Sequence, residues 1–422
     1  MPFAVRPAGV LMASTLVFSA IMSCALPAQG TAAARPVVIT NASLIDGARG
    51  AFATGATVVI RDGRIVQVAT GGGIAMPSDA TIIDARGRYL LPGLIDAHTH
   101  IASLASARRA LESGVTTIRS ASVAAFQDVA LREAVKQGAF AGPDVVAAGV
   151  FISPELGESV LADPRLAKLA GGLQGEAELR EAVRINLDRG VNVIKTRGTE
   201  RAGLPNTDPR KQSYTETQLG WIVDEASKRN IPVMAHAHGD EGAYAAVKAG
   251  VRSIEHGTFL SDSTLQLMKQ KGTYLVPTYI TVLDLTQPGG DYDDPALTIR
   301  GNFMLPALGE TVRRAHRMGI PIATGADTQY GPESLSRIAG EAALFVDLGM
   351  SPLEALRSAT SVSASLLGLG DRIGAIKEGY EADLILVESN PLQNIRALAD
   401  VLVVISNGTI ALNRTPFAKT RM

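Results

Sequence analysis

The sequence alternates strand-like apolar runs with helix-like amphipathic segments, and this alternation occurs eight times between residues 92 and 365. Runs such as Val191–Lys195 are apolar or nearly so up to their last residue, which indicates strands buried on both faces. Amphipathic segments, for example Glu176–Leu187 and Glu216–Lys228, separate the runs. Repeated strand–helix units form parallel sheets, so eight units within about 270 residues predict a (β/α)8 barrel of TIM type. The runs end near Ala97, Ser120, Val150, Lys195, His236, His256, Thr278 and Ala326.

Two short segments with β patterns flank the predicted barrel. Their strand-like runs are Val37–Thr40, Thr57–Arg61 and Arg64–Val68 before it, and Ala382–Val387 and Val401–Ile405 after it. Asp62-Gly63 and Asn407-Gly408 are typical of two-residue hairpin turns. Because the ends of a domain tend to lie close together, we expect residues 35–91 and 366–422 to form one discontinuous β-sandwich domain, with residues 92–365 forming the barrel.

The first 34 residues are typical of a secretory signal peptide. Arg6 supplies a positive charge, Gly9–Ala25 is almost wholly apolar, and Ala- and Gly-rich sequence continues to Ala34. The apolar stretch is only marginally long enough for a membrane anchor, so we expect no membrane span in the mature chain. Cys24 is the only cysteine and follows Ile21-Met22-Ser23, which leaves a lipoprotein signal as an alternative. We therefore expect an exported protein, periplasmic or secreted.

The composition is that of a folded globular protein. The chain has 422 residues, of which 46% are hydrophobic and 19% charged, enough to bury a large core. Its formal net charge is −1, which gives no reason to expect nucleic acid or an anionic membrane as a partner. We expect the protein to be a homo-oligomer.

Five of the six histidines lie at the ends of predicted strands. They are His98 and His100 on the first strand, His236 and His238 on the fifth, and His256 on the sixth. A spacing of two residues along a strand places both side chains on the same face, here the barrel interior. Lys195 ends the fourth strand and Asp327 follows the eighth. Barrels of this type carry their chemistry at the C-terminal strand ends, so we expect these side chains to converge there.

Each of these residues has a simpler explanation when it is taken alone. A lysine at a strand end is usually solvated, and a single histidine there is usually a hydrogen-bonded polar residue rather than a ligand. The gathering of all of them at one end of one predicted barrel favours a metal site. His316 serves as a contrast, because it lies in the basic helical stretch Val312–Arg317 and is assigned no role.

Several motifs resemble a known family. Leu91–His100 is similar to the first-strand signature of the amidohydrolase superfamily, and Gly379–Leu384 is similar to part of that superfamily's β-sandwich. Lys195, His236, His256 and Asp327 match its remaining metal-bearing strands. Met234–Gly239 and Ser253–Gly257 resemble the imidazolonepropionase-like branch, which includes Xaa-Pro dipeptidases, carboxypeptidases for basic residues and ochratoxin amidohydrolases.

The resemblance implies two divalent metal ions. Lys195 would be carboxylated by CO2, and the resulting carbamate would bridge the ions. His98, His100 and Asp327 would bind one ion, and His236 and His256 the other. Nitrogen and oxygen ligands without sulfur favour Zn²⁺, with Mn²⁺ and Co²⁺ as alternatives.

The resemblance also implies a mechanism of amide hydrolysis. A bridging water, activated by the metals to hydroxide, would attack the carbonyl carbon, and Asp327 would pass its proton to the leaving nitrogen. His238 would polarise the carbonyl or stabilise the oxyanion; support of a metal ligand is the alternative.

The substrate is less well defined by the sequence. Arg197 would face the interior if the fourth strand continued, and its guanidinium would pair with a substrate carboxylate. Tyr279 and Tyr330 are candidate pocket walls, with ordinary surface positions as the alternative for all three. The long connections Phe151–Gly175 and Ile280–Arg300 are expected to be lids or specificity loops.

These features favour a dipeptide or an N-acyl amino acid as substrate, with ochratoxin A as a related amide. Lactone hydrolysis is chemically similar to amide hydrolysis, so a lactonase is an alternative. An imidazolonepropionase or deaminase is disfavoured by Lys195, and a non-catalytic scaffold by the complete ligand set.

Overall fold

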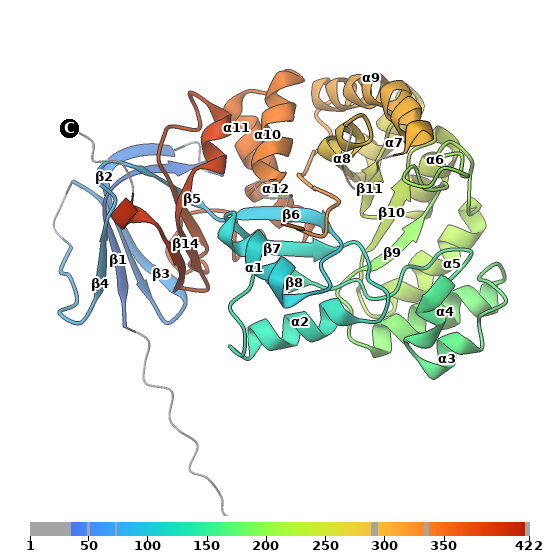
Figure 1. Cartoon of the computed structure of the whole chain (residues 1–422), viewed down its shortest axis with the longest axis horizontal. Coiled ribbons are helices and arrows are strands. Elements are labelled where there is room, and N and C mark those ends of the chain that lie inside the picture. The colour runs from blue at the N-terminus through green and yellow to red at the C-terminus, as the bar shows by residue number, and fades with distance from the viewer. Residues whose placement is uncertain (1–34, 49–50, 72–73, 288–293, 333–336, 418–422) are drawn as a thin grey trace, which may run out of the picture. The chain divides into compact units, whose positions relative to one another are not determined.

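The computed structural model describes residues 35–48, 51–71, 74–287, 294–332 and 337–417 (Figure 1). The expected signal peptide and Cys24 lie outside the described residues. Within the described ranges, no helix combines the length and the apolar character needed to cross a membrane.

The two flanking segments form a single eight-stranded sheet. Its strands are β1 (Val37–Asp46), β2 (Ala51–Arg61), β3 (Arg64–Thr70), β4 (Thr81–Asp84), β5 (Tyr89–Pro92), β13 (Leu384–Val387), β14 (Val401–Ser406) and β15 (Thr409–Asn413). Their order is β15-β14-β13-β5-β1-β2-β3, with β4 paired to β1. The antiparallel pairing of β13 with β5 joins the two ends of the chain. The strand β5 crosses the boundary expected at residue 91.

Two hairpin turns join neighbouring strands of this sheet, β2 to β3 and β14 to β15. Asp62 and Gly63 both have positive φ, as do Asn407 and Gly408, which is the backbone that a two-residue hairpin of this type requires. The two turns touch, because a Cβ added to Gly408 would lie 2.7 Å from the Cα of Gly63. Glycine is therefore required at residue 408 both by conformation and by space.

Between the two flanking segments, seven further strands form two parallel sheets. The first contains β6 (Leu94–Thr99), β7 (Val115–Ser120) and β8 (Asp144–Val146), and the second contains β9 (Ile194–Arg197), β10 (Val233–Ala237), β11 (Ser253–His256) and β12 (Tyr274–Val276). Their orders are β6-β7-β8 and β12-β11-β10-β9. Isolated parallel bridges connect them: Ile152 pairs with Thr196, Leu275 with Ile322, and Thr99 with Thr328. The structure thus contains the parallel sheets that the alternation predicted.

Two of the predicted strands differ from expectation. The third ends at Val146 rather than near Val150, because Gly149 adopts a left-handed backbone with φ of 68°. The eighth is not a regular strand, and Ile322 and Thr328 form only isolated bridges. Asp327 lies between them with φ of 45°, a conformation that interrupts an extended strand.

Helices follow most strands and lie beside them, as Figure 1 shows for α4 to α7 next to β9 to β11. They are α1 (Leu104–Glu112), α2 (Gln127–Lys136), α3 (Pro164–Ala167), α4 (Glu176–Asp188), α5 (Glu216–Ser227), α6 (Asp240–Ala249), α7 (Asp262–Lys271), α8 (Tyr279–Asp284), α9 (Pro295–Arg317), α10 (Arg337–Asp347), α11 (Pro352–Ser358) and α12 (Ser361–Leu366), with short 3-10 turns at Gly157–Leu161, Ile395–Ala399 and Thr415–Phe417. The helices α4 and α5 match their predicted ranges to within one residue.

The two long connections are not simple loops. Phe151–Gly175 contains a 3-10 turn and α3, and Ile280–Arg300 contains most of α8 and the start of α9. Asp294 caps α9 by accepting from the backbone N–H groups of Ala296 and Leu297. Residues 288–293 of the second connection lie outside the described residues.

Candidate active site

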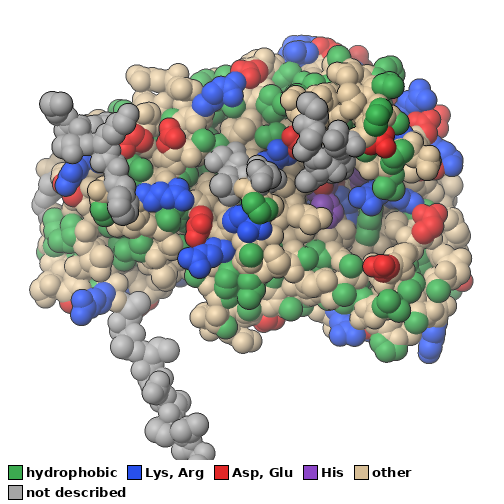
Figure 2. All heavy atoms as spheres, viewed as in Figure 1, with side chains coloured by type: hydrophobic (Ala, Val, Ile, Leu, Met, Phe, Trp, Pro, Cys, Tyr) green, Lys and Arg blue, Asp and Glu red, His purple; other side chains and the backbone are tan. Residues whose placement is uncertain are grey.

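The five strand-end histidines converge. The ring centroids of His236 and His238 lie 4.5 and 4.6 Å from that of His256, and the His98 ring lies 5.0 Å from it. His100 lies 5.7 Å from His98. In the space-filling view a histidine is visible in a recess beside Lys or Arg side chains (Figure 2).

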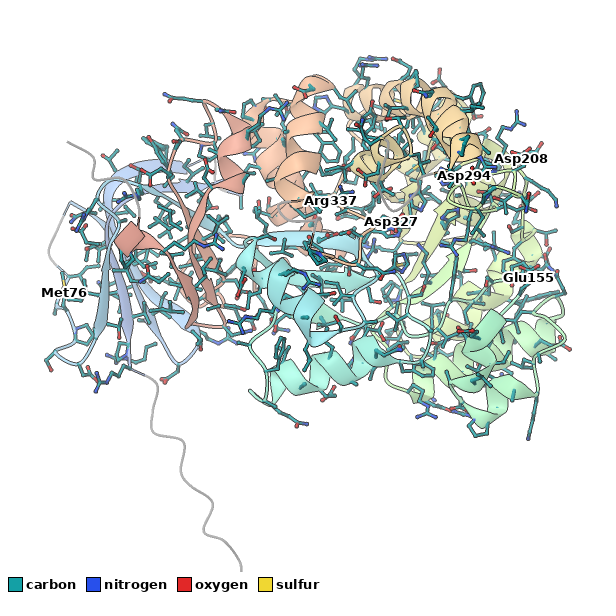
Figure 3. The ribbon with its side chains drawn as sticks, in the orientation of Figure 1. Met76, Glu155, Asp208, Asp294, Asp327 and Arg337 are labelled. Atoms are coloured by element: carbon teal, nitrogen blue, oxygen red, sulfur yellow. The ribbon has the colours of Figure 1, made fainter. Side chains whose placement is uncertain are left out.

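Lys195 and Asp327 complete this cluster. The Nζ of Lys195 lies 3.4 Å from Nε2 of His98. The Oδ1 of Asp327 lies 3.0 Å from Nε2 of His100 and 3.5 Å from Nε2 of His98. Figure 3 shows Asp327 near the end of β6. The backbone N–H of Asp327 donates a hydrogen bond to the carbonyl oxygen of His98, which lies on β6. The structure therefore brings together every residue that was expected to bind metal.

A buried ion pair fixes the orientation of His98. Nδ1 of His98 lies 2.7 Å from Oε2 of Glu255, so this nitrogen donates its proton and Nε2 carries the lone pair. Arg119 donates to both carboxylate oxygens of Glu255 at 2.9 and 3.1 Å, and its Nε donates to the carbonyl of Ala97 at 2.7 Å. Burial disfavours ionisation of Glu255, but Arg119, His98 and Lys195 together outweigh burial and lower the pKa of that carboxyl to about 2. Glu255 is therefore a carboxylate at neutral pH.

Backbone carbonyls orient two further histidines. Nδ1 of His100 lies 2.8 Å from the carbonyl oxygen of Ser122, and Nε2 of His236 lies 3.1 Å from that of Glu200. A carbonyl oxygen only accepts, so each of these nitrogens carries a proton. In a neutral ring the other nitrogen then presents its lone pair. That other nitrogen is Nε2 in His100 and Nδ1 in His236.

Threonine hydroxyls hold the remaining two rings. Nδ1 of His238 lies 2.8 Å from Oγ1 of Thr258, and Nδ1 of His256 lies 2.7 Å from Oγ1 of Thr278. Thr199 adds a contact by accepting from the backbone N–H of His238 at 2.9 Å. One nitrogen of every ring is thus held by the protein, an arrangement that is typical of histidine ligands to a metal.

Burial keeps the imidazoles of His98, His236, His238 and His256 neutral. It lowers the pKa of His98 to about 4 and that of His238 to about 3, and Lys195 adds to the lowering in both cases. Burial also holds the pKa values of His236 and His256 well below the usual range. Neutral rings with directed lone pairs are the form that binds a divalent ion.

The candidate ligand atoms of this cluster fall into two groups, and the atoms within each group lie within 4.8 Å of one another. One group is His236, His238 and His256, and the other is His98, His256 and Asp327. This grouping differs from the expected division, because His256 belongs to both groups and His238 joins one of them. The donor set of imidazoles and a carboxylate suits Zn²⁺ and similar divalent ions.

Lys195 is the most unusual group in the cluster. Its side chain is enclosed, with the residue 2% exposed, and its Nζ lies 5.6 Å from the centre of the Phe151 ring. Burial lowers the pKa of Lys195 to about 8. A substantial fraction of the amine is therefore neutral and nucleophilic near pH 8.

Asp327 is ionised at neutral pH. Burial opposes its ionisation, but His98 and His100 outweigh burial and hold the pKa of this carboxyl well below its usual range. A carboxylate in this position can accept a proton. Its positive φ is the strained backbone that turns the side chain out of the line of the preceding segment.

Tyr330 does not form a pocket wall, contrary to expectation. It is fully buried, and its hydroxyl donates to Oδ2 of Asp96 at 2.8 Å. Oδ1 of Asp96 accepts from the backbone N–H groups of His98 and Ala326, both at 3.0 Å. Asp96 and Tyr330 therefore tie the segment carrying Asp327 to β6.

Arg197 and Tyr279, which were expected to contact the substrate, both contact other parts of the protein. Nη2 of Arg197 lies 2.8 Å from Oε2 of the exposed Glu155, and its buried Nε has no partner among the described residues. Tyr279 is half-buried at the start of α8, where a Cβ on Gly309 would lie 3.3 Å from its hydroxyl. The ring of Tyr279 therefore packs against α9.

The sequence reasoning missed several functional neighbours. Glu255 and Arg119 lie within predicted strands, and Asp96 lies inside the motif that carries His98. A charged residue inside an otherwise apolar strand was the available signal, because such a residue needs a buried partner. Arg201 was also missed: it follows the Glu200 carbonyl that contacts His236, it is exposed, and within the described part of the chain its side chain forms no ion pair.

Comparisons with known proteins show the family to which the chain is similar. The model of the amidohydrolase family matches residues 89–411. The ochratoxinase of Aspergillus niger is 29% identical over 356 residues, covering 74% of this chain and 72% of the relative. The imidazolonepropionase of Caldanaerobacter subterraneus subsp. tengcongensis is 24% identical, covering 79% and 84%. A crystal structure of a Xaa-Pro dipeptidase with methionine bound in its active site has a TM-score of 0.81 and 28% identity, covering 89% of this chain and 99% of that one.

Proposed function

The chain belongs to the amidohydrolase family and is a hydrolase acting on C–N bonds, and we propose that its substrates are dipeptides or N-acyl amino acids with a free carboxylate. The family confirms the resemblance that the sequence motifs indicated. The observation that carries the proposal is the set of five histidines, each with one ring nitrogen held by the protein, around Lys195 and Asp327.

We propose that the cluster holds two divalent ions. The fit rests on the donor set, because neutral imidazoles with directed lone pairs lie beside an ionised Asp327. The proposed ligands are His98, His100, His236, His256, Asp327 and a carbamate on Lys195. When bound, divalent ions polarise a carbonyl group and lower the pKa of water. Zn²⁺ is the favoured ion.

The carbamate would form from Lys195 itself. The neutral Nζ attacks CO2, a nitrogen–carbon bond forms, and the amine proton is lost to solvent. The burial of Lys195 favours this product, because a cationic ammonium in this site lacks solvation whereas its neutral form is accessible near pH 8. The product is an anion with two oxygens, in place of a cation.

The remaining steps use this chain's own side chains. Hydrolysis forms a carbon–oxygen bond from water and breaks the carbon–nitrogen bond. We propose that the carboxylate of Asp327 accepts the proton of the attacking water and delivers it to the leaving nitrogen. His238 is placed to stabilise the negative charge that develops on the carbonyl oxygen, and Thr258 holds its ring in orientation. Glu255 orients His98 in the same way.

Charge favours a substrate with a carboxylate. After burial, Arg201 adds to the lowering of the pKa values of both Lys195 and His236, so it lies within electrostatic reach of the cluster. Arg197 lies at the end of β9, two residues from Lys195, and pairs with an exposed glutamate that a substrate carboxylate could displace. We propose that Arg201, with Arg197, binds the carboxylate of the substrate.

The fold and location belong to the same proposal. We propose that the bridges at Ile152, Leu275 and Thr99 close the two parallel sheets into one eight-stranded barrel. The terminal sheet would be its β domain, built from residues 35–91 and 366–422. We also propose export through residues 1–34, with lipidation at Cys24 as the alternative, and a homo-oligomeric state.

A matched substrate pair tests the carboxylate requirement. Hydrolysis of an N-acyl phenylalanine is compared with that of the N-acyl phenethylamine, which lacks only the carboxylate. We expect kcat/KM to be higher for the acid, and Arg201→Ala to raise KM for the acid about 10-fold or more, the loss expected for one charge-assisted hydrogen bond. Arg210→Ala is the control, because Arg210 lies on the same connection but pairs with Asp208. Equal rates for both substrates would contradict the proposal.

The lactonase alternative uses the same cluster, and turnover of lactones without turnover of any amide would favour it. A scaffold would hydrolyse neither class. The cluster retains every expected ligand, which favours catalysis.

A further inference from the structure

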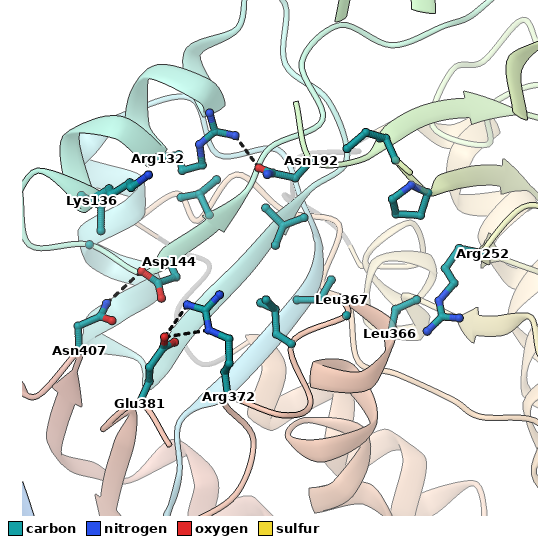
Figure 4. A pocket seen from close by; sticks show the side chains of 18 of the residues that line it. Arg132, Lys136, Asp144, Asn192, Arg252, Leu366, Leu367, Arg372, Glu381 and Asn407 are labelled. Carbon is teal, nitrogen blue, oxygen red and sulfur yellow. Dashed lines mark hydrogen bonds and ion pairs between the residues drawn. The ribbon is translucent and has the colours of Figure 1, made fainter. Parts of the chain in front are cut away.

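A second cluster of oxygen atoms lies away from the histidines, on an open cavity of about 1350 Å³. The cavity is lined by residues at the starts of the parallel strands, including Asp144 of β8 and Val233 of β10, and by the terminal sheet (Figure 4). The histidines lie at the opposite strand ends. Three carboxylates meet here, those of Asp144, Glu381 and Asp383, with one oxygen of each within 4.8 Å of the others.

Each of these carboxylates is held by donors on one oxygen. Oδ1 of Asp144 accepts from the side-chain amide of Asn407 at 3.0 Å, and Oδ1 of Asp383 accepts from the backbone N–H of Asn407 at 2.8 Å. Oε1 of Glu381 accepts from Arg372 through both Nε, at 3.0 Å, and Nη2. Among the described residues, no donor reaches the second oxygen of any of the three. The three groups are thus fixed in position, and each keeps one oxygen free.

One of these carboxylate oxygens and a neighbouring serine hydroxyl are buried. Oδ2 of Asp383 and Oγ of Ser406 have no hydrogen-bond partner in the described part of the chain, although the two residues are only 4% and 7% exposed. The register pairs Leu384 with Ile405, and its continuation by one residue sets Asp383 beside Ser406 on the adjacent strand. Opposed residues of an antiparallel pair project from the same face, and Ser406 lines the cavity together with Asp144 and Glu381. Leaving a buried polar atom without a protein partner is costly, so these two oxygen atoms are available to bind an ion.

The charges of the cluster do not balance. Arg372 pairs with Glu381, and Arg64 approaches the same oxygen at 3.7 Å. Asp144 and Asp383 have amide donors but no cationic partner among the described residues. Burial raises the pKa values of both, and their mutual repulsion adds to this for Asp383. Two fixed carboxylates therefore lack a counter-charge.

We propose that Asp144, Glu381, Asp383 and Ser406 bind a hard divalent cation, Ca²⁺ or Mg²⁺, through the oxygen atoms that the protein leaves free. A site made only of carboxylate and hydroxyl oxygens selects such ions, whereas the imidazole-rich catalytic cluster selects Zn²⁺ and similar ions. The cation would connect the start of β8 to β13 and β14, so it would stabilise the attachment of the terminal sheet. It would take no part in the reaction.

The experiment uses the full metal-loaded enzyme, with Ca²⁺ and Mg²⁺ as separate probes in calorimetry and thermal unfolding. We expect one ion to bind per chain and to raise Tm by about 3 °C at 100 times its Kd. Asp144→Asn and Ser406→Ala should each weaken binding at least 10-fold. Asp79→Asn is the control, because Asp79 is an exposed carboxylate outside the cluster. The ion with the tighter Kd identifies the class that the site prefers.

Failure of this proposal can be separated from failure of the catalytic one. Lys195→Ala should keep the full Ca²⁺ or Mg²⁺ response, since the two sites share no residue. The proposal is overturned if neither ion binds the wild-type protein, or if Asp144→Asn and Ser406→Ala, with wild-type circular dichroism, respond like the control. It is also overturned if acidification to pH 5 raises Tm while cations have no effect, because Asp144 and Asp383 would then share a proton instead.

Discussion

Replacement of Glu255 by glutamine tests how the second layer of residues supports the histidine cluster. Glu255 is completely buried. Its carboxylate accepts a hydrogen bond from Nδ1 of His98, and both of its oxygens accept from Nη2 of the buried Arg119. Glu255→Gln keeps the shape but removes the negative charge. Arg119 is then left as a buried cation without its partner, which costs about 3–5 kcal/mol of stability.

The same change should weaken metal binding. A neutral amide accepts the hydrogen bond from Nδ1 of His98 less strongly than a carboxylate does. Nε2 of His98 then becomes a weaker and less well oriented metal ligand. Residues that orient metal ligands typically contribute 10- to 100-fold in metal affinity or activity, and we expect a loss of about that size here. The assays are denaturant unfolding, metal competition against a chelator, and kcat/KM on one N-acyl amino acid.

Glu225→Gln is the matched control. Glu225 is also a buried glutamate, and it pairs with Arg180, Arg184 and Lys228 on the outer helices. Its replacement should lower stability but leave metal affinity and kcat/KM unchanged. If Glu255→Gln folds and binds metal with wild-type affinity, the orienting role assigned to Glu255 is wrong.

Two further predictions concern buried side chains, Tyr330 and Glu341. Tyr330→Phe removes the hydroxyl that donates to Oδ2 of Asp96, so we expect a loss of about 1–3 kcal/mol in denaturant unfolding with little change in KM, whereas a large rise in KM would restore Tyr330 as a substrate contact. Burial raises the pKa of Glu341 to about 8, above its value of about 4.5 in an unfolded chain. The folded protein therefore holds this proton more strongly, and the stabilising contribution is complete below about pH 4.5 and is lost as pH rises through 8. Glu341→Gln should remove that part of the pH dependence, and an unchanged stability profile between pH 5 and pH 9 would contradict it.

The sequence predicted the cluster well because its members follow a simple rule. His98, His236 and His256 lie at the ends of apolar runs, and parallel strands bring such ends together whatever the details of the loops. Hairpin turns at Asp62-Gly63 and Asn407-Gly408 were predictable for a similar reason, since few residue pairs adopt positive φ at both positions.

The contacts that orient the cluster were not predictable in the same way. Arg119 of β7 and Glu255 of β11 meet between the two parallel sheets, and their pairing depends on which face of each strand turns toward the other sheet. Tyr330 was a candidate pocket wall because it follows a strand end, but the backbone has a positive φ at Tyr330 and the ring is buried. The start of α9 had a visible signal in Asp294-Pro295, a cap residue followed by proline at the first helical position.

The central claim is that Lys195 is a metal-bridging carbamate, and the metal content of Lys195→Ala tests it most directly. Purified wild-type protein should contain about two divalent ions per chain, measured by elemental analysis. Lys195→Ala should lose most of this metal together with its activity, because both ions lose a shared ligand. Acetate or propionate should restore part of both by occupying the vacated space.

Lys195→Arg separates the two possible roles of the lysine. A guanidinium stays cationic and cannot become an anionic bridge, so this variant should contain as little metal as Lys195→Ala. If Lys195 were a cation that binds substrate, the arginine variant would keep part of the activity and KM would rise for carboxylate substrates. Wild-type metal content in purified Lys195→Ala would contradict the bridging role, even if activity were lost.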